Sequence, residues 1–462
     1  MTKARKQGLG ARKLALIWAL IALLTPGLRL INWVNAPDAH VAASVGSDLP
    51  DLEAVFADAP RYYAYAQAML GRPYDSYYIR PVEGWRQDQG PPHRLATPDH
   101  ALTPWRDFSM EYPPGALVAI LPPALLASGV ASYFAVFALE MALCLALALW
   151  LGMRAAERLR PGAGAWVLQF GVFYYILTTL LVSCHYDALV ALTLAGFAYG
   201  VVVGLPMVAG LALTAAVLVK GAPVLLVPLA LAHFLYSAQW RRVAAAAAIS
   251  AVVLGAAGAL YLEAAGAHAF DMFAYHSARP VQIESLWGGV AVILHMLGLA
   301  LFQPVESFGS VNIEASYEPA MRALSFPLTA LAVLAVIVWR LWRLTQGEDE
   351  ATRARRTLAA SAAAMIAFMA LGKVFSPQYV IWLFPLALVP AAAGDARSAK
   401  VLMAAVLLTQ IEFPFLYQLS VNGLGVVVLA RDALLLASAW LLVAGAAPSP
   451  RSERLAPAAA PG

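Results

Sequence analysis

Acidic, basic and phenolic side chains gather in one polar tract of an otherwise apolar chain. The tract opens with Asp58-Ala-Pro-Arg-Tyr-Tyr-Ala-Tyr and closes with Arg106-Asp-Phe-Ser-Met-Glu-Tyr. Such groups are too costly to leave in lipid, so the tract must lie outside the bilayer. Carboxylates, guanidinium groups and phenols at a membrane surface have the chemistry to hold and activate a polar substrate. We interpret this tract as one half of an active site.

A second set of polar residues lies in the later, mostly apolar part of the chain. With the spans assigned below, these residues fall at the outer ends of helices or in outer turns. The set consists of His185, Tyr186, Asp187, Lys220, 276–285, 373–379, Glu412 and Arg431. Ionisable groups at membrane depth are costly, so their gathering at one level predicts a shared polar cavity. An anionic headgroup would suit such a cavity.

Simpler structural roles are open for part of this set. In one alternative, the aliphatic stems of Lys220 and Lys373 lie along apolar surface and their ammonium groups reach the outer headgroups. His185 also suits a packing histidine, and the adjacent Arg431 and Asp432 suit a structural ion pair.

The elements that position these groups must be membrane helices. The 462-residue chain is 61% hydrophobic and 13% charged, with a mean hydropathy of +0.70. A soluble fold needs more polar surface than this composition supplies. The net charge of +4 does not suggest a nucleic-acid partner. Cys144 and Cys184 both lie in apolar segments, so we expect neither a disulfide nor a thiol nucleophile.

Apolar runs and the distribution of Lys and Arg predict an all-α polytopic bundle of about twelve transmembrane helices. The predicted spans are 14–33, 131–153, 165–182, 188–203, 208–219, 224–236, 243–263, 321–342, 358–371, 380–392, 401–411 and 432–443. The apolar stretches 113–128 and 286–302 are instead assigned to the outer surface as interfacial helices. Crossings there would place the arginines at 154–160 and 340–356 outside, against the positive-inside rule. Both termini then lie in the cytoplasm.

This topology gives one transmembrane domain over 1–447. Its first extracytoplasmic loop covers 34–112, and a second extracytoplasmic region covers 264–320. The remaining residues, 448–462, are rich in Pro and Ala and are expected to form a disordered cytoplasmic tail. Several predicted spans are shorter than the roughly 20 residues of a full crossing, which favours a cavity in the outer half of the bundle.

Within the first loop, local signals predict a short helix that begins near Asp58. Pro60 suits its first turn, and Gly71 suits the left-handed conformation that ends a helix. Asp58 is therefore also placed to act as a helix N-cap.

Several blocks of residues carry a resemblance to a known family. In chain order they are Asp58-x-x-x-Tyr62-Tyr63-x-Tyr65-Ala66 with Gly71-Arg-Pro-Tyr74, Asp107-Phe108-x-x-Glu111-Tyr112-Pro113-Pro114-Gly115, Lys220-Gly-x-Pro223, Arg279-Pro-x-Gln-x-Glu284-Ser285 and Lys373-Val-Phe-Ser-Pro-Gln-Tyr379. Together they resemble the GT-C superfamily, and within it glycosyltransferase family 87, the polyprenol-phosphate-mannose-dependent mannosyltransferase-like proteins. The resemblance spans nearly the whole chain.

The resemblance implies a GT-C-like bundle in the plasma membrane with an extracytoplasmic active site. It also implies an inverting transfer of a sugar, mannose by family analogy, from a polyprenyl-phosphate donor to a hydroxyl of an envelope glycolipid or glycan. Attack at the anomeric carbon passes through an oxocarbenium-like state, while the hydroxyl loses a proton and the leaving phosphate gains charge. This chemistry needs a carboxylate on one side of the sugar and cations on the other.

Residue roles follow from the resemblance. Asp58 matches the acidic position of the first outer loop that serves as general base, with Asp51, Glu53 and Glu111 as alternatives. Glu111 is also placed to orient the acceptor or Arg106. The candidate contacts to the donor phosphate are Lys373, Arg279 and Lys220, because Arg binds phosphate bidentately and Lys acts as a point charge. The candidate contacts to sugar hydroxyls are His185, Tyr186, Asp187, Gln282, Glu284, Gln378 and Tyr379.

We expect neither a metal nor another cofactor. The histidines do not have metal-ligand spacing, and the sequence has no nucleotide-binding glycine loop, which agrees with a lipid-linked sugar as co-substrate. The competing function is a multi-span transporter or flippase of lipid-linked sugars, which should show internal repeats and polar residues near the midplane. A polymerase or ligase for lipid-linked glycans would share the outer loop and use a pyrophosphate-linked donor. A non-enzymatic scaffold leaves the clustered outer charges unexplained.

Overall fold

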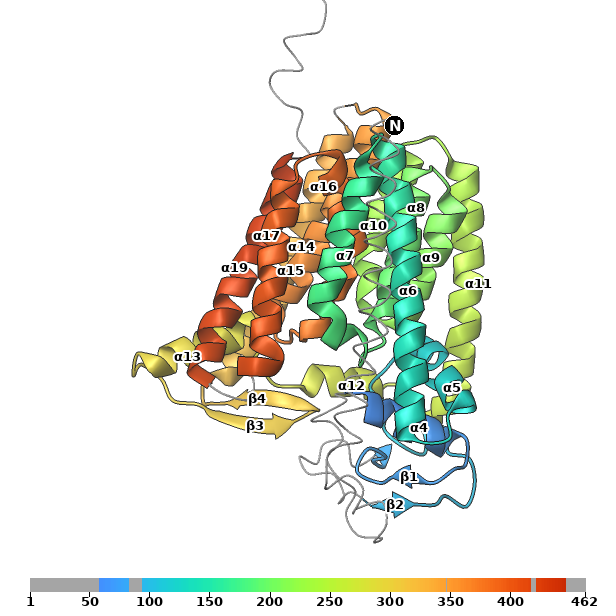
Figure 1. Ribbon diagram of the computed structural model, residues 1–462, viewed down its shortest axis with the longest axis vertical. Coiled ribbons are helices and arrows are strands. Elements are labelled where there is room, and N and C mark those ends of the chain that lie inside the picture. The colour runs from blue at the N-terminus through green and yellow to red at the C-terminus, as the bar shows by residue number, and fades with distance from the viewer. Residues whose placement is uncertain (1–57, 83–93, 346, 417–420, 446–462) are drawn as a thin grey trace, which may run out of the picture.

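Long apolar helices lie side by side along one axis in the computed structural model, which describes residues 58–82, 94–345, 347–416 and 421–445 (Figure 1). Within these described ranges, five helices are long and apolar enough to cross a membrane. They are α6 (Val130–Leu159), α11 (Trp240–Ala265), α14 (Glu318–Leu344), α15 (Glu350–Leu371) and α19 (Val421–Gly445). The chain is therefore a helical membrane protein, as its composition predicts. The predicted first span, at 14–33, and the predicted tail lie outside the described residues.

Shorter elements complete the bundle. They are α7 (Ala163–Val182), α8 (Asp187–Val202), α9 (Pro206–Val219), η3 (Ala222–Leu226), α10 (Val227–Leu235), η5 (Pro377–Trp382), η6 (Phe384–Leu388), α16 (Val389–Ala393), α17 (Arg397–Gln410) and η7 (Ile411–Leu416). Helix α8 packs against α6, α9 and α15, and small residues let it approach them closely. A Cβ on Gly200 would lie only 2.5 Å from the amide nitrogen of Ala209 on α9. The count of about twelve spans stays a prediction.

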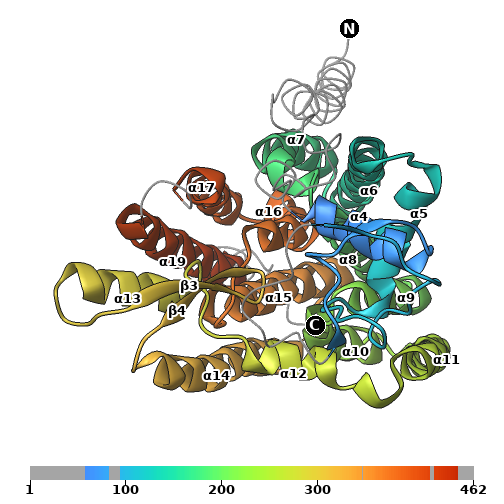
Figure 2. The same cartoon turned by 90° about the horizontal axis from the view of Figure 1, so that it is seen from below.

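Short elements cover one end of the bundle, which we call the site end (lower end in Figure 1; facing the viewer in Figure 2). They are α4 (Ala59–Met69), η2 (Pro114–Ala116), α5 (Leu117–Leu126), η4 (Gly266–His268), α12 (Asp271–Ala278), α13 (Leu286–Met296) and two antiparallel hairpins, β1–β2 (Tyr74–Asp75, Leu95–Ala96) and β3–β4 (Gln303–Ser307, Ser310–Glu314). With 10 and 11 residues, α5 and α13 are too short to cross a bilayer core of about 30 Å. Their non-crossing placement at the outer surface stays a prediction.

Three predicted spans need correction. Helix α19 already includes Val421 and does not start at 432, because Arg431 and Asp432 neutralise each other inside it. Helix α15 begins at Glu350, not at 358, because the Asp349 side chain accepts a hydrogen bond from the Thr352 amide and caps it. The predicted span at 380–392 is broken into 3₁₀, π and α turns in a segment that carries two prolines. The β3–β4 hairpin was not predicted.

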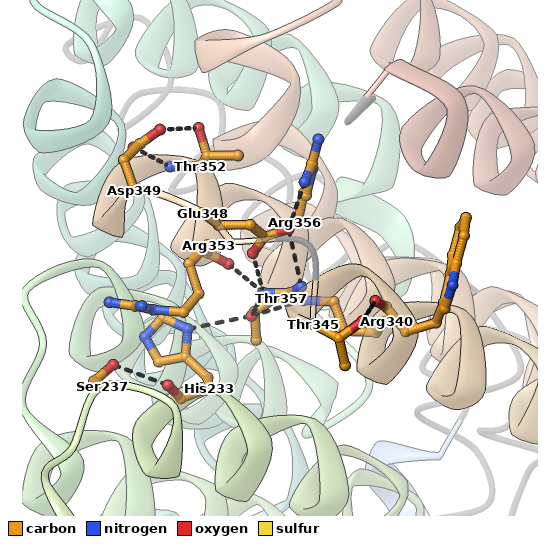
Figure 3. A network of polar contacts seen from close by, with 11 residues as sticks. His233, Ser237, Arg340, Thr345, Glu348, Asp349, Thr352, Arg353, Arg356 and Thr357 are labelled. Atoms are coloured by element: carbon orange, nitrogen blue, oxygen red, sulfur yellow. Dashed lines mark hydrogen bonds and ion pairs between the residues drawn. The ribbon is translucent and has the colours of Figure 1, made fainter. Parts of the chain in front are cut away.

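The opposite end of the bundle holds a buried polar network (Figure 3). Glu348 accepts hydrogen bonds from Arg340 Nη2 at 2.9 Å and Arg356 Nη1 at 2.5 Å. Arg340 Nε also donates to Thr357 Oγ1 at 3.2 Å, and His233 Nδ1 lies 3.2 Å from the same oxygen. The network ties α10, α14 and α15 together. An unpaired charge here would cost several kcal/mol, so these partners depend on one another.

Candidate active site

Asp58 lies immediately before α4 at the site end. Its side chain makes no capping bond to the helix and instead accepts a hydrogen bond from the Tyr62 hydroxyl at 3.2 Å. Its carboxylate lies 3.7 Å from His185 Nε2 and 4.0 Å from Arg61 Nη1. The side chain is 25% exposed. Asp58 is thus a partly accessible carboxylate surrounded by donors, and a simple capping role does not describe it.

The electrostatic surroundings keep this carboxylate ionised. Burial raises the pKa of Asp58, but attraction to His185, Arg61 and Lys220 and the Tyr62 hydrogen bond outweigh it. The pKa is therefore lowered from its ordinary value of 3.8. At neutral pH the group is a carboxylate that can accept a proton.

Lys220 follows α9 and enters a group of four rings that we call the aromatic chamber. The rings are Tyr112, Tyr186, Tyr379 and Trp382, with centroids 5.7, 4.5, 5.6 and 5.8 Å from Lys220 Nζ. These distances are in the range of cation–π attraction. The same ammonium lies 3.7 Å from Asp187 Oδ1. Lys220 is 17% exposed, so its position is set by these contacts and a headgroup-reaching lysine does not describe it.

Asp187 is the first residue of α8, where the helix dipole favours a negative charge. Its Oδ1 accepts a hydrogen bond from Trp382 Nε1 at 2.7 Å. Its Oδ2 is buried and has no hydrogen-bond partner among the described residues. Buried carboxylate oxygens are normally satisfied, so this atom is available for a donor on a bound molecule.

The Tyr-Pro-Pro-Gly motif brings the outer loop to the end of α9. A Cβ on Gly115 would lie 2.5 Å from the carbonyl carbon and oxygen of Leu218, so only glycine allows this approach. Tyr112 precedes the contact by three residues and Lys220 follows it by two. The glycine contact therefore fixes the Tyr112 ring beside the lysine.

Glu111 binds the outer loop to α4 and α12. It accepts hydrogen bonds from Arg61 Nη1 at 3.2 Å and from the Tyr65 hydroxyl at 2.9 Å. Its main-chain oxygen accepts from His276 Nε2 at 3.0 Å. Arg61 thus links the carboxylates of Asp58 and Glu111.

Arg279, Lys373 and Gln282 form a second group, at the far end of α12. Lys373 Nζ donates to the main-chain oxygens of Ser277 at 2.9 Å and Arg279 at 2.6 Å. An ammonium has three donors, so these bonds use two of them. Arg279 Nη2 donates to Ser310 Oγ at 2.8 Å.

Glu284 contacts Gln282 of this second group and a buried network around Arg431. It accepts a hydrogen bond from the Gln282 amide, and burial raises its pKa to about 7. Its main-chain oxygen accepts from Arg431 Nη2 at 2.6 Å, and Arg431 is also paired with Glu412 and Asp432. This group is a buried ion-pair network that packs against the Phe375 ring, 3.8 Å from the Arg431 guanidinium carbon. The structural alternative for Arg431 and Asp432 is the one that the contacts support.

The comparison with known families agrees with the motifs. The model of glycosyltransferase family 87 matches residues 111–355, more than half of the 462-residue chain. The chain belongs to glycosyltransferase family 87. None of the curated proteins matches it. Among solved structures, it is similar to ArnT from Cupriavidus metallidurans in the apo state and bound to undecaprenyl phosphate, each at 14% identity and a TM-score of 0.44. These alignments cover 94% and 93% of this chain and 78% of the ArnT chain.

The glycosyltransferase brings part of the predicted site together. One connected group of predicted site residues surrounds Tyr62 and Tyr112. It contains Asp58, Glu111, His185, Tyr186, Asp187, Lys220 and Tyr379. Gln378 is partly exposed in η5, next to the Tyr379 ring that stacks on Trp382. The alternative bases Asp51 and Glu53 lie outside the described residues. The described residues contain no group of His, Cys, Asp or Glu that could hold a metal ion.

Sequence reasoning missed two residues of this candidate site. Trp382 binds Asp187 and lies beside Lys220, although it comes only three residues after the Lys373–Tyr379 block. Arg61 pairs with Glu111 across 50 residues of sequence. Its place within the Asp58 block was the available signal, but its partner is fixed by tertiary folding.

Proposed function

We propose that this family 87 glycosyltransferase moves a sugar, mannose by family analogy, from a polyprenyl-phosphate donor to a hydroxyl of an envelope glycolipid or glycan. The reaction takes place at the extracytoplasmic face, inverts the anomeric configuration and uses Asp58 as general base. The observation that carries the proposal is the ionised, partly exposed Asp58 carboxylate, held between Arg61 and the aromatic chamber that contains Lys220. ArnT is described in complex with undecaprenyl phosphate, a lipid phosphate of the class proposed here as the leaving group.

The bond changes assign a side to each group. The acceptor oxygen forms a bond to the anomeric carbon while the carbon–oxygen bond to the phosphate breaks, and its electron pair goes to the phosphate. Asp58 takes the proton of the acceptor hydroxyl and later releases it to water. In the transition state an oxocarbenium-like sugar lies between the acceptor oxygen and the leaving phosphate. Polyprenyl phosphate leaves with the additional negative charge.

The cations of the site are proposed to stabilise that charge. Lys220 lies in the aromatic chamber, and Lys373 and Arg279 lie at the far end of α12. Arg suits bidentate binding of phosphate, and Lys supplies a point charge. The buried Asp187 Oδ2, which has no partner among the described residues, is proposed to accept a hydrogen bond from a sugar hydroxyl.

The test follows labelled sugar transfer by the full-length protein in lipid discs. Radiolabelled polyprenyl phosphomannose serves as donor, with a mixed envelope-lipid acceptor, and release of polyprenyl phosphate is measured together with the anomeric configuration of the product. Asp58→Asn keeps the size and the Tyr62 bond acceptor but removes the base, so the rate should fall by about 10²- to 10⁴-fold. Donor binding should change less than twofold.

The matched control is Asp99→Asn, which removes the same charge from an exposed position of the same loop. It should keep the wild-type rate. A product that retains the donor configuration, or an Asp58→Asn protein with wild-type rate, would contradict the proposal. Donor transport without release of polyprenyl phosphate would favour the flippase.

A further inference from the structure

Tyr62 of α4 touches both the proposed base and two rings of the aromatic chamber. Its hydroxyl donates a hydrogen bond to Asp58 Oδ2 at 3.2 Å. Its ring centroid lies 5.6 Å from that of Tyr112 and 5.6 Å from that of Tyr186. Those two rings have their centroids 5.7 and 4.5 Å from Lys220 Nζ. Tyr62 therefore links the carboxylate of the proposed base to the ammonium of the chamber.

The helix start and the surrounding rings fix the position of Tyr62. Its amide donates to the Asp58 main-chain oxygen at 3.1 Å, and residues four apart share one face of a helix. The Tyr62 side chain is 1% exposed and also packs against Phe137 of α6, with centroids 5.5 Å apart. Because α4, α6 and the residue before α8 all hold the ring, its hydroxyl is presented to Asp58 in one place.

The two carboxylate oxygens of Asp58 differ in their partners. Oδ2 accepts the Tyr62 hydrogen bond, and His185 Nε2 lies 3.7 Å from it. Oδ1 lies 4.0 Å from Arg61 Nη1, beyond hydrogen-bond distance, and accepts no hydrogen bond from the residues that the structure describes. A carboxylate with one engaged oxygen can still accept a proton or a hydrogen bond at the other. Oδ1 is thus the oxygen left for an incoming hydroxyl.

The Tyr62 bond also favours the ionised form of the carboxylate. The groups that face Asp58 come from α4, the outer loop, the turn between α7 and α8, and the end of α9; they are Arg61, Tyr62, Tyr112, His185 and Lys220. The Tyr62 hydrogen bond is one of the interactions that lower the pKa of Asp58 against the effect of burial. Loss of this bond should therefore raise the pKa of Asp58.

We infer that Tyr62 is a positioning residue of the proposed reaction: its hydroxyl holds Oδ2 of Asp58, so that Oδ1 takes the proton of the acceptor hydroxyl, and its ring fixes the base relative to Lys220. The inference rests on the proposed function. Tyr62 neither gains nor loses a proton in the step. Its own O–H stays bonded to Oδ2 while the new O–H bond forms at Oδ1 and the acceptor oxygen bonds to the anomeric carbon.

The informative variant is Tyr62→Phe, which removes the hydroxyl and keeps the ring. Sugar transfer is measured in lipid discs between pH 3 and 7, with polyprenyl phosphomannose as donor and a mixed envelope-lipid acceptor. At pH 7 kcat should fall about tenfold, because the carboxylate is no longer held in one orientation. The acid midpoint of kcat should rise by about one pH unit, because the ionised form loses a hydrogen bond. The KM for the donor should stay within twofold, since the ring and the cations are unchanged.

The matched control is Tyr133→Phe. Tyr133 of α6 is also fully buried, and its hydroxyl donates to the Ile120 main-chain oxygen at 3.0 Å. The control therefore loses a buried hydroxyl bond of the same kind without touching the base, and it should keep the wild-type kcat and acid midpoint. An unchanged acid midpoint or an unchanged kcat at pH 7 in Tyr62→Phe would each overturn the inference, as would equal changes in Tyr133→Phe.

The proposed function and this inference fail separately, because the protonation of Asp58 can be followed without the reaction. A water-soluble carbodiimide reacts with protonated carboxyl groups, and mass spectrometry of the labelled peptide gives the pH midpoint for Asp58. If the wild type transfers no sugar, the proposed function is wrong. A labelling midpoint about one pH unit higher in Tyr62→Phe than in wild type and Tyr133→Phe would still support the hold of Tyr62 on this carboxylate. Equal labelling midpoints in all three proteins would overturn it.

Discussion

Gly115→Ala tests how the outer loop positions the proposed site. The glycine Cα faces the last turn of α9, and a Cβ would lie 2.5 Å from the Leu218 carbonyl atoms and 2.8 Å from the Val219 nitrogen. Ordinary contacts begin at 3.4 Å, so the two backbones must separate by about 0.9 Å. Neither backbone can rotate away as a flexible side chain would.

This separation of the two backbones would displace two proposed site residues. Tyr112 is three residues before Gly115, and Lys220 directly follows Val219. The variant should lose about 10²-fold in the rate of sugar transfer, because a displacement of about 1 Å has that effect on a preorganised site. Overpacking of this kind should also cost about 1–3 kcal/mol of stability.

The assay compares single-turnover transfer and thermal unfolding in lipid discs. Gly129→Ala is the control, since a Cβ there would meet nothing within 4 Å and its φ of −174° is accessible to alanine. It should behave as wild type. A Gly115→Ala protein with the wild-type rate would refute the positioning role of this contact, even if its unfolding temperature falls.

Two further predictions concern charge. Burial, with Arg322 and Arg279 nearby, lowers the pKa of Lys373 to about 8, so the ammonium is charged below that pH and neutral above it. If Lys373 binds the donor phosphate, the KM for the donor should rise about tenfold between pH 7 and 9. Lys373→Arg should remove this rise. A wild-type KM that stays flat over this pH range argues against the role. Glu348→Gln leaves Arg340 and Arg356 without their buried carboxylate and should destabilise the protein by about 3–5 kcal/mol. Thermal unfolding should then occur at a lower temperature, with little change in the transfer rate below the transition. An unchanged unfolding temperature would show that this network is not needed for stability.

Local signals predicted the short helix after Asp58 correctly. Pro60 and Gly71 bracket α4, which spans Ala59–Met69, and Gly71 has the expected positive φ of 67°. The distribution of arginines also predicts that 113–128 and 286–302 do not cross, and this stays a prediction. The bounds of α4 depend on residues close in sequence, so sequence carries them.

Tertiary contacts decided what sequence could not. The pairing of Arg61 with Glu111 joins residues 50 positions apart, and the contact of Trp382 with Asp187 joins residues 195 apart. Arg431 also interrupts an apolar run, which placed the predicted start of the last span too late. Its charge is balanced by Glu412 and Asp432 inside the bundle, and no local pattern announces those partners.

The most direct test of the central claim is the single-turnover rate of sugar transfer by wild type and Asp58→Asn between pH 5 and 8. The pKa of Asp58 is lowered from 3.8, so the carboxylate is ionised throughout this range. We predict a wild-type rate that does not depend on the titration of an acid here, and a variant rate about 10²- to 10⁴-fold lower at every pH. A wild-type rate that falls with a midpoint near 6, or an Asp58→Asn rate equal to wild type, would contradict the assignment of Asp58 as base.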